Sequence, residues 1–193
     1  MDKEKSMRKI FVFILLFLSI FSVLAQSEIP VKIESITASS MYEEQRDVNE
    51  YKPSKVFDGD LKTGWFENAD GPGINETLTI VFAEPILIDM IKVFPGWFNP
   101  KYWNQNHRIK EMKITFNDEK YLITKFKDIM AGQNVKIGGK LPVTKIEFQI
   151  LDTYPSKNYD DTGITEIHFY NGSTRYVPNL DNFAMDFIVK PKE

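Results

Sequence analysis

The chain has 193 residues, with 24 lysines and arginines against 27 aspartates and glutamates, and it contains no cysteine. This length fits one domain, and a hydrophobic fraction of 42% with 26% charged residues excludes a disordered chain and a multi-span membrane protein. The formal net charge of −3 gives no basic face for nucleic acid, and the lack of cysteine excludes disulfides and thiol catalysis.

Residues 1–25 have the pattern of a secretory signal peptide. Basic residues precede a mostly apolar run over 10–25, which is short for a helix that spans a bilayer. The small residues Val23 and Ala25 suit a cleavage site before Gln26. The alternative is an uncleaved membrane anchor. We expect cleavage near Ala25 and a protein secreted to the periplasm, the cell surface or the medium.

The rest of the chain predicts antiparallel β-strands. Apolar and polar residues alternate in segments 31–36, 78–82, 85–94, 112–116, 120–126, 143–151 and 163–170. Asn117-Asp118 predicts a hairpin turn between 112–116 and 120–126. No window of a dozen residues has a helical period. We therefore predict one all-β domain over 26–175, a sandwich or jelly roll.

Residues 176–193 form a C-terminal tail. Phe183, Met185, Phe187 and Val189 alternate with other residues as in a strand. We therefore expect the tail to pack on the domain.

Three long segments, 39–76, 95–108 and 152–161, do not have a strand pattern and are rich in polar and aromatic residues. In an all-β scaffold, loops at the ends of the sandwich are the usual place for function.

Five motifs follow one another in these loops and the strands beside them: Thr37–Met41 (TASSM), Pro53–Trp65 (PSKVFDGDLKTGW), Trp65–Glu76, Phe94–Lys110 and Tyr154–Ile167. In this order they resemble the NADase-type glycan-binding domain, a bacterial discoidin-like (galactose-binding-like) module. They extend over about residues 33–170. The resemblance implies a jelly-roll β-sandwich of the discoidin type that binds glycans. One departure is Phe94-Pro-Gly-Trp97, where the family often has a Gly-Tyr pair.

The turn Asp58-Gly-Asp60 and the nearby Thr63 supply hard oxygen ligands at a spacing that suits Ca²⁺. The resemblance implies a structural calcium ion held here by Asp60, Thr63 and Glu166, with Asp58 close by. The alternative is that the two aspartates only cap and turn the backbone. Trp65, which follows the turn, is expected in the core.

The segment 96–108 combines aromatic, amide, histidine and arginine side chains. Aromatic rings stack on the apolar face of a pyranose, while amide and guanidinium groups satisfy sugar hydroxyls. Together with the second polar-aromatic loop, this segment gives the candidate glycan contacts: Trp97, Phe98, Asn99, Tyr102, Trp103, Asn106, Arg108, Tyr159 and Asp160. The alternative is that the aromatic residues close the end of the sandwich while Asn106 and Arg108 hold the loop.

No catalytic motif is present: the chain has no Gly-x-Ser-x-Gly elbow, no His-Glu-x-x-His and no phosphate-binding glycine loop. The resemblance places NAD cleavage by the toxin in a separate domain. We therefore expect a monomeric, non-enzymatic module whose partner is a glycan or glycoconjugate, and which does not bind nucleic acid. The alternative is a discoidin domain that binds a membrane surface or a host protein.

Overall fold

The computed structural model describes residues 27–42 and 51–180. The elements, in chain order, are β1 (Glu28–Ala38), the 3-10 helix η1 (Pro53–Phe57), β2 (Trp65–Phe66), β3 (Thr77–Pro95), β4 (Arg108–Phe116), β5 (Lys120–Lys125), β6 (Gln133–Tyr154), β7 (Gly163–Asn171) and β8 (Thr174–Asn179). Among the described residues, no helix has the length and apolar character needed to cross a membrane. The expected leader, 1–25, and the alternating part of the tail, 183–189, lie outside the described residues.

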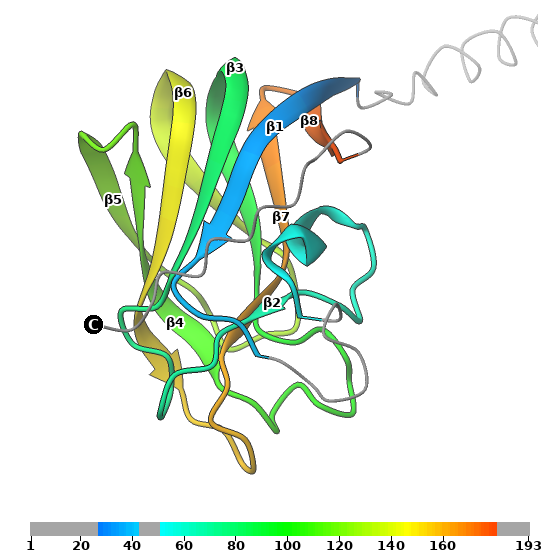
Figure 1. Ribbon diagram of the computed structural model, residues 1–193, viewed down its shortest axis with the longest axis vertical. Helices are drawn as coiled ribbons and strands as arrows, with labels where there is room; N and C mark the ends of the chain where they lie inside the picture. Colours follow the sequence, from blue (N-terminus) through cyan, green and yellow to red (C-terminus); the bar gives the residue numbers. More distant parts are fainter. Residues whose placement is uncertain (1–26, 43–50, 181–193) are drawn as a thin grey trace, which may run out of the picture.

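The strands form a single hydrogen-bonded sheet in the order β2-β7-β8-β1-β3-β6-β4-β5, and a further pairing of β7 with β3 folds this sheet back on itself. All pairings of named strands are antiparallel except that of β1 with β8. In Figure 1, β1, β3, β6, β4 and β5 fan across one layer, and β7 lies behind them. The two layers enclose one hydrophobic core, so the predicted all-β sandwich is confirmed.

β3 and β6 are long enough to take part in both layers. They pair along nearly their whole length, from Thr77 opposite Gln149 to Val93 opposite Gln133, with register shifts on either side of the central pairs. Pro85 lies in the irregular stretch of β3, and Gly138, at φ 87°, lies in that of β6. Proline cannot donate to a ladder and glycine tolerates positive φ, so both residues suit a bend.

The structure differs from the predicted strands in this region. The segments 78–82 and 85–94, predicted as separate strands, form the single bent β3. The first half of β6 and the whole of β8 were not predicted. The bends in β3 and β6 explain the difference, because a bend within a continuous strand contains the same proline and glycine residues as a loop between two strands.

The hairpin predicted at Asn117-Asp118 is confirmed. Both residues have positive φ values, 52° and 61°, which asparagine and aspartate tolerate. The Asn117 side-chain oxygen also accepts the backbone N–H of Thr144, at 2.9 Å. The turn is thereby tied to β6.

Trp65 is fully buried, as expected, and its indole N–H donates to the Ser40 carbonyl at 2.9 Å. Its strand pairs with the start of β7, where Phe66 lies opposite Gly163. A β-carbon at Gly163 would lie 2.4 Å from the Trp65 carbonyl oxygen and 2.6 Å from the Phe66 ring. The absence of a side chain at Gly163 therefore lets β2 approach β7.

We expect Gly163→Ala to lower the free energy of unfolding by about 1–3 kcal/mol, the usual cost of forcing an atom into a packed site. Gly139→Ala is the matched control, because a β-carbon there meets nothing within 4 Å. It should change stability by no more than about 0.5 kcal/mol, as exposed substitutions usually do. Urea denaturation of both variants measures the difference. Equal stability of the two variants would contradict this account of Gly163.

Candidate functional site

Two of the three loops singled out in the sequence lie against each other at one end of the sandwich (Figure 1). The backbone N–H of Lys157 donates to the Asn104 carbonyl at 3.0 Å, and that of Tyr159 donates to the Gln105 carbonyl at 2.9 Å. The segments 96–107 and 155–161 are therefore built as one unit. This is the arrangement expected if both loops cap the same end.

The first of these loops is shaped by its own polar residues. The Asn99 side-chain oxygen accepts the N–H of Lys101, and its carbonyl accepts the N–H of Trp103 at 2.8 Å. At Gly96, φ is 119° and a β-carbon would lie 2.8 Å from the Arg108 side chain. Glycine is therefore required where β3 turns into the loop.

A pocket of about 480 Å³ opens between these loops, Tyr42 and residues 51–66, and we call it the loop pocket. Its lining residues are Tyr42, Tyr51, Lys62, Phe66, Trp97, Asn99, Tyr102, Asn106, Tyr159 and Asp161. Six of them are aromatic, and the others carry amide, ammonium or carboxylate groups. Apolar walls with a few polar groups that fix orientation are typical of small-molecule sites.

The aromatic rings of the loop pocket differ in how far their faces are covered by neighbouring side chains. Trp97 stacks on Tyr102 with ring centroids 4.7 Å apart and an interplanar angle of 12°, and it meets Phe66 edge-on. Its indole N–H donates to the Lys62 carbonyl at 2.8 Å. Trp97 is therefore a fixed wall with one face covered. Tyr159, by contrast, is 49% exposed.

The charged groups of the loop pocket are Lys62 and Asp161. Asp161 is partly buried, and burial raises the pKa of its carboxyl above the ordinary value, with a smaller contribution from the neighbouring charge of Asp160. The backbone carbonyl of Asp161 accepts the N–H of His107 at 3.1 Å, which fixes its position beside the first loop.

The structure divides the predicted glycan contacts into two groups. Those that line the loop pocket are Trp97, Asn99, Tyr102, Asn106 and Tyr159. Those that do not are Phe98, Trp103, Arg108 and Asp160.

The residues of the second group have other surroundings. Phe98 is buried against Phe94 and Trp103. Arg108 is also buried, and it binds the Asp128 carboxylate at 2.7 Å and the Pro155 carbonyl at 2.6 Å. These contacts match the alternative interpretation, in which Arg108 holds the loop.

Sequence reasoning did not select five of the lining residues: Tyr42, Tyr51, Lys62, Phe66 and Asp161. Asp161 follows a selected residue and was within reach of the same argument. The two tyrosines and Phe66 come from the segment before β3, and only the tertiary fold brings them to the loops.

The predicted metal residues lie around one turn and β7. The Asp58 carboxylate accepts the Thr63 hydroxyl at 2.8 Å and the Asp60 N–H at 2.9 Å, and it pairs with Lys55 at 3.1 Å. Asp60 in turn accepts the N–H of Lys62 at 2.9 Å. These are the capping contacts of the alternative interpretation.

Glu166 joins this turn to β7. Its side chain is buried, and Oε1 accepts the Gly59 N–H at 2.5 Å. Oε2 has no hydrogen-bond partner; it lies 3.3 Å from Nε2 of His168, outside hydrogen-bond geometry. Within residues 27–42 and 51–180, no group of three or more His, Cys, Asp or Glu side chains is gathered closely enough to hold a metal ion by itself.

A second buried carboxylate, Glu67, lies next to the loop pocket residue Phe66. Its Oε1 accepts the N–H of Thr162 at 2.8 Å, and its Oε2 accepts that of Ala69 at 2.7 Å. A β-carbon at Gly73 would lie 2.5 Å from its carboxyl carbon. Burial raises the pKa of Glu67 from 4.5 to about 7, because desolvation outweighs the two hydrogen bonds.

Residues 29–170 match the family model of the NAD glycohydrolase translocation F5/8 type C domain, which agrees with the resemblance found in the sequence. Several solved structures have the same fold. A family 32 carbohydrate-binding module from a family 31 glycoside hydrolase of Clostridium perfringens is 18% identical, with a TM-score of 0.56 over 72% of this chain and 90% of that one.

Two further solved structures have the same fold. The family 32 module of C. perfringens NanJ, solved with galactose, is 14% identical, with a TM-score of 0.55 over 71% of this chain and 93% of that one. An F5/8 type C domain from Bacteroides fragilis is 17% identical, with a TM-score of 0.52 over 71% and 90%. These matches establish the discoidin-type β-sandwich. No curated protein sequence matches the chain.

We expect the stability of the protein to fall as the pH rises from about 4.5 to 7. In this range folded Glu67 keeps a proton that the unfolded chain has released, so the stability that it contributes below pH 4.5 is lost by pH 7. One such group gives a slope of at most about 1.4 kcal/mol per pH unit. Urea denaturation at several pH values measures the slope.

Glu67→Gln should flatten this pH dependence and lower stability throughout, because an amide oxygen replaces only one of the two acceptors. Glu84→Gln, at an exposed carboxylate of β3, is the matched control and should leave the slope unchanged. An unchanged slope in Glu67→Gln would contradict the assignment.

Proposed function

This chain belongs to the NAD glycohydrolase translocation F5/8 type C domain family, and we propose that it is a secreted, non-catalytic glycan-binding module. The observation that carries the proposal is the loop pocket, in which six aromatic rings surround amide and charged groups. Secretion rests on the leader pattern of residues 1–25.

The contents of the loop pocket suit a sugar. A pyranose has apolar C–H faces and a rim of hydroxyls, so it is bound by ring faces together with amide and carboxylate groups. Asn99 and Asp161 supply acceptors, and Lys62 supplies a donor. Solved relatives of this fold include a module in complex with galactose, which supports the same use of the fold here.

Within this proposal, Tyr159 is the stacking platform. Stacking needs an accessible ring face, and Tyr159 is the lining aromatic residue with the largest exposed surface, at 49%. Trp97 serves as the wall that positions the sugar, because Tyr102 covers one of its faces and its N–H is occupied by Lys62. The division of roles follows from packing rather than from residue type.

The absence of catalysis is also part of the proposal. Among the described residues, the histidines hold structural contacts: His107 lies 3.2 Å from the Tyr154 carbonyl, and His168 packs on Phe94. The alternative is a domain that binds a protein or membrane surface. The concave loop pocket favours a small polar ligand over a flat surface.

We expect Tyr159→Ala to weaken glycan binding by about 2- to 13-fold, the loss of roughly 0.5–1.5 kcal/mol of stacking. Tyr121→Ala is the matched control, because Tyr121 is 64% exposed and lies outside the loop pocket. A glycan array identifies a ligand, and calorimetric titration compares the variants.

Two outcomes would contradict the proposal. Failure of every glycan to bind, together with retention on liposomes, would favour the surface-binding alternative. Equal weakening by Tyr159→Ala and Tyr121→Ala would remove Tyr159 from the site.

We also propose that the turn 58–63 holds a structural calcium ion. The residues fit such an ion because Glu166 is buried and its Oε2 has no hydrogen-bond partner, while hard oxygen atoms of Asp60 and Thr63 lie in the turn that Glu166 contacts through Gly59. Asp60, Thr63 and Glu166, with Asp58 beside them, would hold it. A bound Ca²⁺ would supply charge compensation for the buried carboxylate and would cross-link the turn to β7.

The melting temperature should rise on addition of Ca²⁺ and fall when a chelator is added. Glu166→Gln should abolish this shift, because it removes the negative charge that the ion would compensate. Glu119→Gln, remote from the turn, should retain the shift. Identical melting curves with Ca²⁺ and with chelator in the unmodified protein would rule out the ion.

A further inference from the structure

The turn between β7 and β8 contains a chemically reactive dipeptide. Asn171-Gly172 is the one place in the sequence where glycine follows asparagine. The side-chain amide of an asparagine is attacked by the backbone nitrogen of the next residue, and glycine offers the least hindered nitrogen because it has no β-carbon. Gly172 and Ser173 are the exposed two-residue loop of the hairpin, and Asn171 pairs with Thr174 at its base. Water therefore reaches this dipeptide.

The backbone nitrogen of Gly172 is held by a side chain from another strand. Its N–H donates to both oxygens of the Asp89 carboxylate, at 2.9 Å and 3.1 Å. The two residues are 83 positions apart in the sequence. Gly172 has a φ of 60°, which suits the first position of a two-residue hairpin loop. The atom that would attack Asn171 is thus fixed both by the turn and by β3.

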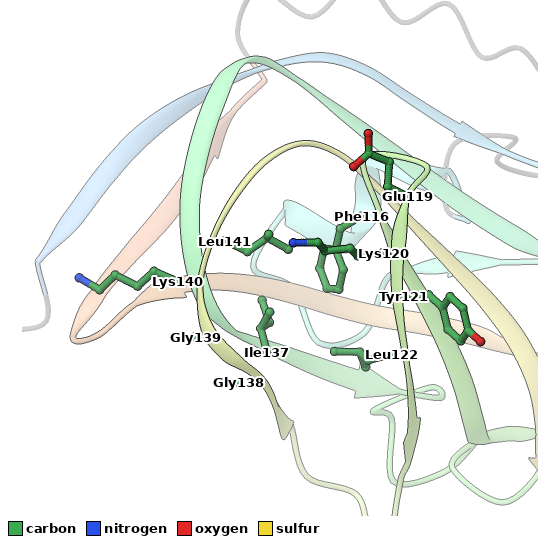
Figure 2. A pocket seen from close by; sticks show the side chains of 10 residues that line it. All are labelled: Phe116, Glu119, Lys120, Tyr121, Leu122, Ile137, Gly138, Gly139, Lys140 and Leu141. Carbon is green, nitrogen blue, oxygen red and sulfur yellow. The ribbon is translucent and has the colours of Figure 1, made fainter.

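Asp89 reaches the turn because β3 is irregular at this point. The register of β3 with β6 shifts between Ile88 and Met90, so Asp89 lies outside the paired register. Figure 2 shows residues 137–140 of β6, opposite this shift, in a bend along a hollow of about 530 Å³. On the other edge of β3, Met90 pairs with Tyr170 of β7. The irregularity therefore sets Asp89 beside the end of β7.

Two properties of this contact oppose the attack on Asn171. A ring closes only when the side-chain carbonyl carbon of Asn171 lies against the Gly172 nitrogen, whereas the ladder pair and the Asp89 hydrogen bonds keep the intervening peptide in the hairpin. The nitrogen must also lose its proton. The charge of Asp89 disfavours this loss, because a second negative charge would form beside the first. The reaction therefore needs a local opening of the hairpin.

From this geometry we propose that Asn171 is a deamidation site, which Asp89 keeps unmodified while the hairpin is closed. When the hairpin opens, the Gly172 nitrogen forms a bond to Cγ of Asn171. The side-chain amide leaves with the proton of that nitrogen as ammonia, and a five-membered succinimide remains. Water then opens the ring at either carbonyl, which gives aspartate or isoaspartate. The reaction needs no enzyme and no oxidant, and it does not depend on glycan binding.

The modification would affect more than the turn. Isoaspartate adds one carbon atom to the main chain, so residue 171 would no longer pair in register with Thr174. β8 pairs with β7 on one side and with β1 on the other. A distorted hairpin would therefore loosen the connection between β7 and β1, and the modified protein should have a lower melting temperature.

The test follows deamidation of the full chain by mass spectrometry during incubation at mildly alkaline pH. Trypsin releases residues 158–175, in which fragmentation locates the change of amide to acid at residue 171. Asn171 should react at least about tenfold more slowly in the folded protein than in a synthetic peptide of residues 168–175, because opening must come first. Asp89→Ala should speed the reaction of the folded protein about tenfold, since a hydrogen bond to a charged acceptor is lost.

Matched variants separate the roles of charge and shape. Glu84→Ala removes an exposed carboxylate from the same strand and should leave the rate unchanged. Asp89→Asn keeps the shape and one acceptor oxygen but not the charge, and its rate should lie between those of the unmodified protein and Asp89→Ala. Asn171→Gln should show no conversion at residue 171. Urea denaturation checks that each variant folds.

Three results would overturn the proposal. Equal rates in the folded protein and in the synthetic peptide would mean that the hairpin gives no protection. An unchanged rate in both Asp89→Ala and Asp89→Asn would remove Asp89 from the account. A slower reaction in Asp89→Ala would make the carboxylate a base that promotes ring closure.

Discussion

The loop end of this sandwich depends on hydrogen bonds between buried carboxylates and backbone N–H groups of neighbouring segments. Glu67 accepts N–H groups from Ala69 and Thr162, and Glu166 accepts that of Gly59. Glu76, which is only partly buried, accepts side-chain hydroxyls instead, from Ser39 and Ser40. Each carboxylate joins two stretches of chain that are far apart in sequence. In a chain without cysteine, these contacts do what disulfides do in many exported domains.

A carboxylate used in this way carries a penalty that a disulfide does not. Desolvation disfavours its charged form, which is why the pKa of Glu67 is raised to about 7 even though two N–H groups point at it. Removing one partner leaves the other buried and unsatisfied, so these contacts are specific as well as stabilising. The charges of Asp161, in the loop pocket, and of Glu76 add to the rise in the pKa of Glu67.

The sequence predicted those features of the fold that depend on residues close together in the chain. Alternation located most strands, Asn117-Asp118 identified the hairpin, and the hydrophobic character of Trp65 placed it in the core. The continuity of β3 through Pro85 was not visible, because a bulge and a loop share the same residues. The loop pocket was only half predictable. Phe98 and Asn99 are adjacent, yet one is buried and the other lines the pocket, and no pattern in an irregular loop tells the faces apart.

The position of the loop pocket follows from one property of the fold. Because β3 and β6 run through both layers, their loops gather at one end, while their bends leave β5 as an uncovered edge near the other. Residues that line the loop pocket come mostly from loops, with Phe66 from β2.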